Sequence, residues 1–366
     1  MGKYQELAAA LRSFESSEKP AVTVGFDGFI DTMITVVDER KSLNDWQPMD
    51  GIPQLADWIS QAAGRSALRE IVIQGEDAGG CAVNLGDGLI ALDLPVHCYA
   101  TLGAPMHNAF QDFATACHSC ISWGTEHGKT LAFEFDDGKI MFCATSQLAE
   151  LDPSLLADVL SDGKYQASCA ASSTIVLTNW TLYPHMTDCW NYLIENVYSK
   201  LEHRPRFMID LVDPSGRTDA DIIAMLNTLP AFEPCGPVTL NLNGSEGNTV
   251  ALCLGIAEAA DELEPVLAQS KAIREKLNID EVTIHCIKFA ASSTAQASEA
   301  MATAYAEKPK KSTGAGDRFN AGYTLGHILE LPMDLRLLCG GVCSGFFVRN
   351  ARSGSIAELA EFADSQ

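Results

Sequence analysis

The sequence is short of positive charge. Its 366 residues include 25 Lys and Arg against 48 Asp and Glu, which gives a formal net charge of −23 at pH 7. A field of this sign repels polyanions within about one Debye length, roughly 8 Å at physiological ionic strength. We therefore expect no binding to nucleic acid or to an anionic membrane, and any phosphate site must carry its own local positive potential.

Long hydrophobic runs are also missing. The longest uncharged apolar stretch, residues 337–348, is shorter than the ~20 residues that a membrane-spanning helix needs. Residues 1–19 follow the pattern of an amphipathic helix with charges throughout, and they lack the continuous apolar core of a signal peptide. These features predict a cytoplasmic protein with no membrane partner.

Cysteine is too sparse for a disulfide scaffold, since the chain has 12 residues of this type and most stand singly in apolar runs. We interpret them as buried, reduced thiols. The examples are Cys98, Cys143, Cys253, Cys339 and Cys343. Cys117 and Cys120 have a metal-like spacing, but no second Cys or His pair stands nearby in the sequence to complete four ligands, so no zinc site is predicted.

Two nucleotide-binding motifs are absent. No G-x-x-x-x-G-K-[ST] occurs in the chain, which excludes a P-loop NTPase. No G-x-G-x-x-G follows the first predicted strand, and the pair Gly314 and Gly316 near the C-terminus lacks a third glycine. An NAD-dependent oxidoreductase of the Rossmann type therefore fits poorly.

The chain does show a regular alternation of apolar, β-branched runs with segments of helical period. Strands are expected at residues 21–26, 69–75, 95–103, 173–180, 206–213, 237–243 and 281–289, and helices at 52–63, 81–92, 184–201, 219–229 and 246–277. This alternation predicts an α/β fold with a mostly parallel sheet covered by helices on both faces. No linker or repeat divides the chain, so residues 1–366 are expected to form a single domain.

Two segments break the alternation. Residues 120–145 contain two apolar strands on either side of Asp136, Asp137 and Gly138, a strong hairpin signal. Together with residues 32–48 they are predicted to form a small β-lid over one edge of the sheet. The apolar face of such a lid could cover its own site or pair with a copy of itself, so a homodimer through the lid is a further prediction.

The most informative segment begins at Lys308. Gly314 and Gly316 allow backbone N–H groups to turn toward a ligand, and the N-terminus of the following helix adds partial positive charge. This is the geometry that holds a phosphate group or an oxyanion. Lys308, Lys310 and Lys311 lie just upstream, so the segment supplies the local positive potential that the net charge requires.

Asp317 follows this anion site directly, where a carboxylate would repel a bound anion. A general base for a hydroxyl nucleophile resolves the conflict, because an alcohol and a phosphoryl group are then the two reactants. The alternative is an ordinary residue of the first helical turn, favoured by the helix dipole. Arg318 either reaches the phosphoryl group or covers the exposed helix face, and the second interpretation is favoured because consecutive helix positions point in different directions.

Residues 312–326, STGAGDRFNAGYTLG, resemble the C-terminal signature of the PfkB-type carbohydrate kinases, the ribokinase-like family. The resemblance implies a three-layer α/β/α sandwich with a small β-lid. It also implies an anion hole made by the loop backbone, with the following aspartate as the catalytic base. The residues assigned to catalysis in this way are Gly314, Ala315, Gly316 and Asp317.

Two further segments resemble family motifs on the substrate side. Residues 79–86, GGCAVNLG, are similar to the GG-x-x-x-N signature that contacts the sugar, and residues 24–31, VGFDGFID, resemble the opening strand whose terminal aspartate holds substrate hydroxyl groups. The substrate-binding residues predicted in this way are Asp31, Gly79, Gly80 and Asn84, with Asp27 as a weaker candidate on the same strand face. The structural alternatives are a tight βα turn and a strand end or loop cap.

Residues 243–246, NGSE, are similar to the N-x-x-E motif of the family. Glu246 would organise a water-coordinated Mg²⁺ ion and Asn243 would face the phosphate groups. The structural alternative is a loop residue and a helix N-terminal residue. Mg²⁺ and ATP are the implied cofactors, and the residues assigned to them are Asn243, Glu246, Lys311 and Thr313.

Two positions depart from the family pattern. If Thr283 matches the Thr of the usual T-x-G-x-x-G strand, His285 and Lys288 occupy the glycine positions, and both ATP and ADP stay open as donors. Lys311 stands where the family often has an acidic residue that helps to bind a monovalent cation. Our hypothesis is that its ammonium group replaces the cation, so that potassium would not activate the enzyme.

The four segments occur in family order and span nearly the whole chain. They predict ATP- and Mg²⁺-dependent phosphorylation of a hydroxyl group of a sugar, sugar acid or nucleoside. The alternative is a ribokinase-like protein that binds a sugar or nucleoside with weak or no kinase activity. The intact Asp317 argues against this alternative, and the missing glycines argue for it.

Overall fold

The computed structural model describes residues 2–15 and 19–366. The strands are β1 (Ala21–Phe26), β2 (Phe29–Arg40), β3 (Trp46–Pro48), β4 (Ile71–Gly79), β5 (Val96–Ala100), β6 (Ser119–Ser122), β7 (Gly128–Phe135), β8 (Gly138–Ala144), β9 (Ser172–Leu177), β10 (Arg206–Asp210), β11 (Val238–Asn243), β12 (Glu281–His285), β13 (Phe289–Ser293) and β14 (Ser298–Ala302). The α-helices are α1 (Lys3–Glu15), α2 (Ile52–Ala62), α3 (Cys81–Ala91), α4 (Gln111–Ala116), α5 (Pro153–Val159), α6 (Lys164–Ala171), α7 (Met186–Asn196), α8 (Asp219–Thr228), α9 (Gly244–Cys253), α10 (Leu263–Leu277), α11 (Ala315–Ile328), α12 (Met333–Asn350) and α13 (Ile356–Asp364).

The main sheet of the described chain has nine strands in the order β14-β13-β12-β11-β10-β9-β1-β5-β6. The strands from β12 to β6 run parallel to their neighbours, whereas β13 and β14 are antiparallel. The mostly parallel sheet is therefore confirmed. The single strand predicted at 281–289 is wrong, because β12 ends at His285 and the chain turns back into β13.

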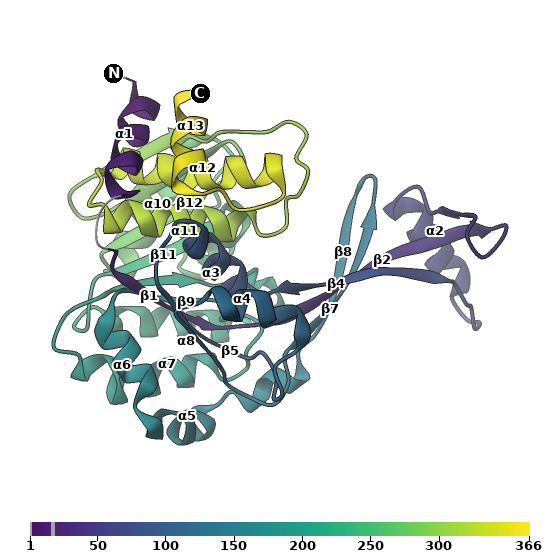
Figure 1. Cartoon of the computed structure of the whole chain (residues 1–366), viewed down its shortest axis with the longest axis horizontal. Helices are drawn as coiled ribbons and strands as arrows, with labels where there is room; N and C mark the ends of the chain where they lie inside the picture. Colours follow the sequence, from purple (N-terminus) through teal and green to yellow (C-terminus); the bar gives the residue numbers. More distant parts are fainter. Residues whose placement is uncertain (1, 16–18) are drawn as a thin grey trace.

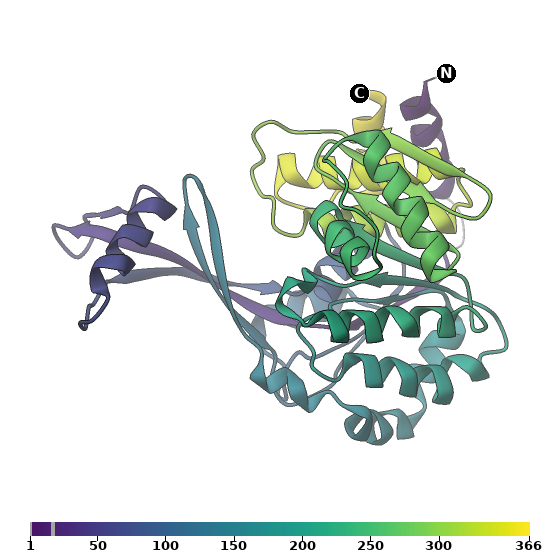
Figure 2. The same ribbon diagram turned by 180° about the vertical axis from the view of Figure 1, so that it is seen from behind.

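Alternate side chains of the central strands enter two separate apolar cores. In β9, Ile175 and Leu177 pack in one core and Val176 packs in the other, and β10 is divided in the same way. Helices α5 to α10 cover the first core, and α1, α3, α4, α11, α12 and α13 cover the second. This arrangement is the three-layer sandwich that the sequence predicts, seen from opposite sides in Figures 1 and 2.

A second, five-stranded sheet projects away from the body (Figure 1). In it β2 pairs with β3, β4 and β7, and β7 pairs antiparallel with β8 around Asp136 and Asp137, which confirms the predicted hairpin. The strand predicted at 69–75 for the main sheet is wrong, because β4 pairs with β2 in this small sheet. Helix α2 packs on one face of the sheet. Strand β6 overlaps the start of the predicted lid segment 120–145, but it lies at the edge of the main sheet.

Other predicted elements differ in their limits. The N-terminal helix spans Lys3–Glu15, and Met1 and residues 16–18 of the prediction lie outside the described residues. The helix predicted at 246–277 is divided into α9 and α10 by a connection that contains Gly255 at a φ of 73°. Within residues 2–15 and 19–366, no helix combines the length and the apolar composition needed to cross a bilayer.

The cysteines are all free, and three of the five examples interpreted as buried thiols are buried. Cys98, Cys339 and Cys343 lie in the core as expected. The interpretation of Cys143 and Cys253 as buried is wrong, because Cys143 is exposed on β8 of the projecting sheet and Cys253 is partly exposed at the end of α9.

The buried carboxylate of Glu281 links the main sheet to α11 and α12. It lies at the sheet edge opposite to the one formed by the strand C-termini. Glu281, the first residue of β12, contacts His327 at 2.7 Å and accepts hydrogen bonds from Arg336 (2.7 Å) and the Tyr323 hydroxyl (2.8 Å). Burial raises the pKa of Glu281, but the charges of His327 and Arg336 outweigh burial and hold the pKa well below its usual range.

Replacing Glu281 by Gln is expected to lower the free energy of unfolding by about 3–5 kcal/mol, because Arg336 then stays buried without its anionic partner. Urea unfolding measures this loss. Since the folded-state pKa is depressed, the contribution is present above the unfolded pKa of about 4.3 and is lost as the pH falls below it. The control Glu126→Gln, whose carboxylate pairs with exposed Lys129, should leave the midpoint unchanged. A loss below about 1 kcal/mol for Glu281→Gln would contradict the assignment.

Candidate active site

Polar residues gather where the parallel strands of the main sheet end. Asp27 follows β1, Asp210 ends β10, Asn243 ends β11 and His285 ends β12. In open α/β sheets this edge is the one that binds ligands. The structure therefore brings several residues of the predicted motifs to one edge.

Asp27 is fully buried and accepts four hydrogen bonds. Its Oδ2 accepts from the Cys81 N–H (2.7 Å) and from Asn179 Nδ2 (2.9 Å). Its Oδ1 accepts from the Ala82 N–H (2.8 Å) and from the Thr178 hydroxyl (2.6 Å). These donors fill the lone-pair positions of the carboxylate. Asp27 thus anchors the N-terminus of α3 to the loop after β9, and we assign it to positioning rather than to substrate contact.

Asp31 lies in β2 of the small sheet. Because β1 ends before Asp27, the prediction that both aspartates share one strand face is wrong. Burial and repulsion from Asp77 raise the pKa of Asp31, and a hydrogen bond with Thr130 and the charges of Lys139 and Lys311 offset only part of this rise. The carboxylate of Asp31 therefore lies within reach of two lysine charges.

The double glycine joins the small sheet to α3. The predicted strand-to-helix turn is confirmed, since β4 ends at Gly79 and α3 begins at Cys81. A Cβ on Gly79 would lie 2.6 Å from Oδ2 of Asp31, and one on Gly80 would lie 3.1 Å from Oδ2 of Asp27. Gly80 also has a φ of 97°, which side chains rarely adopt. A side chain at position 79 would clash with Asp31 and one at position 80 would crowd Asp27, so both positions require glycine.

The anion-hole segment begins α11. Gly314 precedes the helix with a φ of 86°, and Asp317 is buried in the first turn. The first N–H groups of a helix have no intrahelical acceptor, so this end is suited to an anion. A Cβ on Gly314 would lie 3.5 Å from the side-chain amide of Asn84, so the helix start lies beside the glycine-rich segment.

Three buried carboxyl groups share this edge. Burial, followed by repulsion from Asp210, raises the pKa of Asp317 to about 8. Burial raises the pKa of Asp210 to about 6, and burial with repulsion from Asp210 raises the pKa of Glu246 to about 8. Sequence reasoning missed Asp210, although an acidic residue within the apolar strand predicted at 206–213 was a usable signal.

This carboxyl cluster fits a hydrated divalent cation, because a positive ion would stabilise carboxylates whose pKa values are raised by burial and, for Glu246 and Asp317, also by repulsion from Asp210. Within residues 2–15 and 19–366, no group of three or more His, Cys, Asp or Glu side chains is placed to hold a metal ion directly. A magnesium ion at these residues would accordingly be held through water.

Asn243 and Glu246 form a reciprocal cap at the start of α9. Asn243 Oδ1 accepts from the Glu246 N–H (3.0 Å), and Glu246 Oε2 accepts from the Asn243 N–H (2.8 Å). The structural interpretation of this motif is therefore confirmed. The cap also holds Glu246 beside Asp210, so a nucleotide role for the pair remains a prediction.

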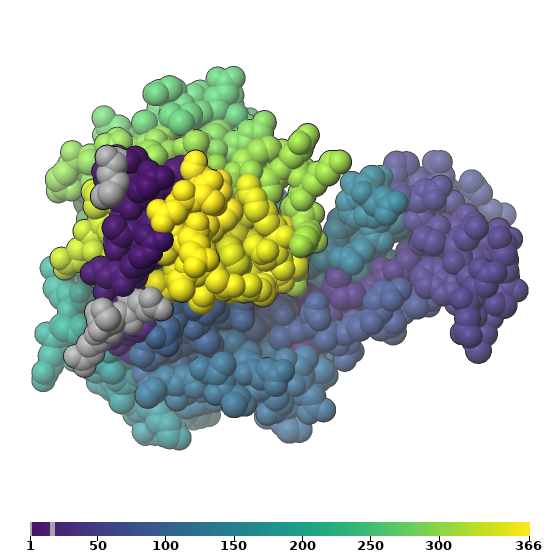
Figure 3. Space-filling view, turned by 45° about the horizontal axis from the view of Figure 1, so that its top comes forward, coloured from purple at the N-terminus to yellow at the C-terminus, as the bar shows by residue number. Residues whose placement is uncertain are grey.

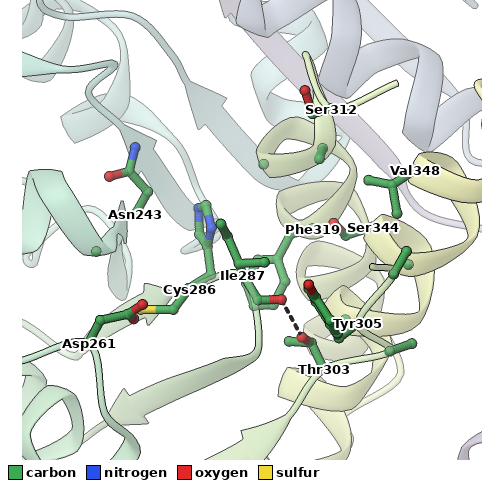
Figure 4. A pocket seen from close by; sticks show the side chains of 18 of the residues that line it. Asn243, Asp261, Cys286, Ile287, Thr303, Tyr305, Ser312, Phe319, Ser344 and Val348 are labelled. Atoms are coloured by element: carbon green, nitrogen blue, oxygen red, sulfur yellow. Dashed lines mark hydrogen bonds between the residues drawn. The ribbon is translucent and has the colours of Figure 1, made fainter. Parts of the chain in front are cut away.

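A cavity of about 660 Å³ opens beside the anion-hole segment. Figure 4 shows Asp261 and Cys286 pointing toward each other on one side, with Tyr305 and Val348 on the other side. The wall also includes Asn243 and the backbone of α11. The volume lies within the roughly 300–1,000 Å³ of small-molecule sites.

His285 forms part of the cavity wall. A Cβ on Gly316 would lie 3.2 Å from its Cε1, and its ring lies 4.8 Å from that of Phe319 between centroids. Burial lowers the pKa of His285 to about 4, so the ring is neutral at physiological pH. Lys288 is exposed near the Tyr305 ring and is not among the wall residues.

Lys139 of the projecting hairpin reaches the anion-hole segment. Its Nζ donates to Thr313 Oγ1 at 3.3 Å, and Lys311, which is exposed, acts with it on Asp31. Sequence reasoning missed Lys139, because a lysine on a lid hairpin resembles an ordinary surface residue. The usable signal was its place opposite Glu134 at the predicted turn.

The favoured interpretation of Arg318 as a cover for an exposed helix face is wrong. Its side chain is 9% exposed and donates from Nη2 to Asp87 of α3 at 2.6 Å. Its guanidinium also lies 4.4 Å from the Phe347 ring centroid. Among the described residues its Nη1 has no hydrogen-bond partner, and this nitrogen lies beside Gly314. Arg318 therefore ties α11 to α3.

Comparison with known proteins gives one family and one common fold. A family model of prokaryotic ketohexokinases matches residues 4–366. A ketohexokinase of Haloferax volcanii is 24% identical over 348 residues, which cover 93% of this chain and 90% of that protein.

Solved structures share the architecture at low sequence identity. A ribokinase from Thermotoga maritima superposes with a TM-score of 0.63 at 12% identity, covering 96% of this chain and 100% of that one. Phosphofructokinase-2 from Escherichia coli gives 0.64 at 10% identity, with 95% and 99% covered. A carbohydrate kinase from Agrobacterium tumefaciens gives 0.63 at 14% identity, with 95% and 97% covered. These likenesses establish the fold.

Replacing Asp27 by Asn is expected to destabilise the free protein by about 3 kcal/mol. The amide nitrogen of Asn would face donor groups whose hydrogen bonds the carboxylate now accepts. Thermal and urea unfolding without ligand measure this effect. The control Asp57→Asn, on the exposed face of α2, should leave both curves unchanged. If Asp27 only bound substrate, the unfolding of Asp27→Asn would match that of the parent protein.

Proposed function

The chain belongs to the prokaryotic ketohexokinase family of ribokinase-like carbohydrate kinases, and from this premise we propose that it transfers the terminal phosphoryl group of ATP to a hydroxyl group of a ketohexose. The observation that carries the proposal is the position of Asp317. It is buried in the first turn of α11, directly after Gly316 of the cavity wall, and its carboxyl group interacts with Cys81 at the start of α3.

The acceptor sugar is assigned to the junction between the small sheet and α3. Asp31 and Asn84 hold its hydroxyl groups, and Gly79 leaves the space that the Asp31 carboxylate occupies. Asp27 fixes the position of this junction by accepting hydrogen bonds from the N–H groups at the N-terminus of α3. The projecting sheet excludes water, which would otherwise compete as the phosphoryl acceptor.

Asp317 is the proposed general base. Efficient general bases have a pKa near the operating pH, and a pKa of about 8 places Asp317 close to it. In its ionised form it removes the proton of the acceptor hydroxyl group as the O–P bond forms. The backbone of Gly314, Ala315 and Gly316 stabilises the phosphoryl oxygens during transfer.

The nucleotide is assigned to the cavity beside α11. Asn243 and His285 line this cavity, and His285 contributes a neutral wall rather than a charge. Asn243 is assigned to the phosphate groups, together with Lys311 and Thr313 of the segment before α11. A magnesium ion bound with the nucleotide supplies charge neutralisation at the phosphate oxygens. Glu246 and Asp210 are the residues proposed to hold its water ligands.

We expect a phosphorylated product from fructose, detected by mass spectrometry, with Mg-ATP as donor and Mg-ADP as the second donor tested. A pool of other sugars, sugar acids and nucleosides defines the acceptor range. Asp317→Asn should lower kcat by about 10²–10⁴-fold, and the matched control Asp57→Asn should retain activity. Ligand binding without product from any acceptor would favour the non-catalytic binding protein instead.

The pH dependence has a defined sign. Asp317 must be ionised to act as a base, so kcat/KM should rise as the pH increases toward about 8 and fall below it. A flat profile between pH 6 and 8 in the parent protein would contradict a base with a raised pKa.

We further propose a homodimer through the small sheet. Four apolar side chains on its face opposite Asp31 are well exposed, with exposed fractions of 44% for Ile71, 61% for Ile73, 45% for Leu131 and 57% for Phe142. An apolar patch of this kind on a projecting sheet favours self-association.

Sedimentation velocity tests the dimer. Phe142→Asp should give a monomer, because a buried charge at the interface is costly. The control Leu252→Asp, an exposed site on α9 of the body, should keep the mass of the parent protein. A parent protein that sediments as a monomer at all concentrations would exclude the proposed dimer.

A further inference from the structure

A lysine of the lid hairpin shares a sheet face with the acceptor-side aspartate. Lys139 lies near the start of β8 and pairs with Glu134 of β7, and Asp31 of β2 pairs with Thr130 of the same strand. Because side chains alternate along a strand, Thr130 and Glu134 project from one face, and so do their partners. Lys139 and Asp31 therefore project from the same face of the small sheet.

The ammonium group of Lys139 lies between the acceptor side and the anion-hole segment. Its Nζ is 3.2 Å from Oε1 of Glu134 and 3.3 Å from Oγ1 of Thr313, next to Gly314. Its charge also offsets part of the rise that burial causes in the pKa of Asp31. The side chain is 23% exposed, so solvent screens it less than a fully exposed lysine.

One donor of this ammonium group is not accounted for. An ammonium group has three N–H donors, and the contacts with Glu134 and Thr313 account for two of them in the described part of the chain. The start of α11 joins the two assigned sites, because Gly316 lines the cavity and a Cβ on Gly314 would lie 3.5 Å from Asn84. The transferred phosphoryl group is therefore assigned to this point, next to Thr313. A lysine at such a point acts as a mobile point charge for phosphate oxygens.

We propose that Lys139 is a catalytic residue that contacts the phosphoryl group during its transfer, an inference that rests on the proposed function. In this step the acceptor oxygen forms a bond to phosphorus, the bond from phosphorus to the nucleotide oxygen breaks, and the hydroxyl proton goes to Asp317. Lys139 keeps its protons and stabilises the charge on the equatorial phosphoryl oxygens. The acceptor is bound by other residues, so Lys139 acts mainly on kcat.

The location of Lys139 on the hairpin links this charge to the position of the lid. The hairpin turn is attached to α2 of the small sheet, where Asp137 Oδ1 accepts from the Ile52 N–H at 3.0 Å. Figure 3 shows the hairpin standing in the gap between the body and the rest of the projecting sheet. The charge of Lys139 reaches the anion-hole segment only while the hairpin stands against it.

The test compares Lys139→Met and Lys139→Arg with Lys129→Met. Lys129 lies on β7 of the same hairpin but pairs with Ile30 on the opposite face, and it is exposed beside Glu126. Steady-state kinetics should show a kcat about 10²-fold lower for Lys139→Met, with the KM for the sugar within about three-fold of the parent value. Lys139→Arg should recover most of kcat, and Lys129→Met should be unaffected.

Calorimetric binding of Mg-ADP with fluoroaluminate and the sugar provides a second readout. Lys139→Met should weaken binding of this phosphoryl mimic by at least ten-fold while Mg-ADP alone binds as in the parent protein. Equal losses for both probes, or a fall in thermal midpoint with unchanged kcat, would overturn the proposal in favour of a structural role. A parent protein without turnover would instead overturn the proposed function. The kinetics of the parent protein are therefore measured before those of any variant.

Discussion

The substrate side of the molecule depends on one buried carboxylate, that of Asp27. A charge removed from water is costly unless hydrogen bonds replace its solvation, and here four donors do so. Two of them are N–H groups at the start of α3, where the helix dipole also favours a negative charge. The glycine-rich turn lies just before these N–H groups, and Asn84 lies in the first turn of α3. Asp31 lies on β2, the strand that follows Asp27 in the chain. The two sheets are therefore fixed to each other where the substrate is assigned.

The charges at the site are separated although the whole chain is acidic. Asp210, Glu246 and Asp317 are buried near the C-terminal ends of the main-sheet strands, and burial, followed by repulsion from Asp210, raises the pKa of Asp317, the proposed base. The positive charges of Lys139 and Lys311, which act on Asp31, come from the lid hairpin and the segment before α11. Two elements distant in the sequence thus place positive charge near Asp31.

Local signals allowed much of the fold and part of the site to be predicted. The turn at Asp136 and Asp137, the glycine pair before α3 and the helix start at Gly314 each depend on a few neighbouring residues. Features that depend on distant partners could not be predicted in this way. Pairing with β2 determines that β4 belongs to the small sheet, and the contact with Asp87 determines the orientation of the buried Arg318 side chain.

The two faces of the β7–β8 hairpin carry side chains of different kinds. Lys139 and Glu134 project from the face that carries Asp31, while Leu131 and Phe142 form an exposed apolar pair on the other face. A shift of one residue in register would exchange these faces, so both proposed roles require one pairing. The contact of Asp137 with the start of α2 holds the turn at that pairing. The same bond therefore supports the lid's apolar surface and the delivery of a positive charge to the anion-hole segment.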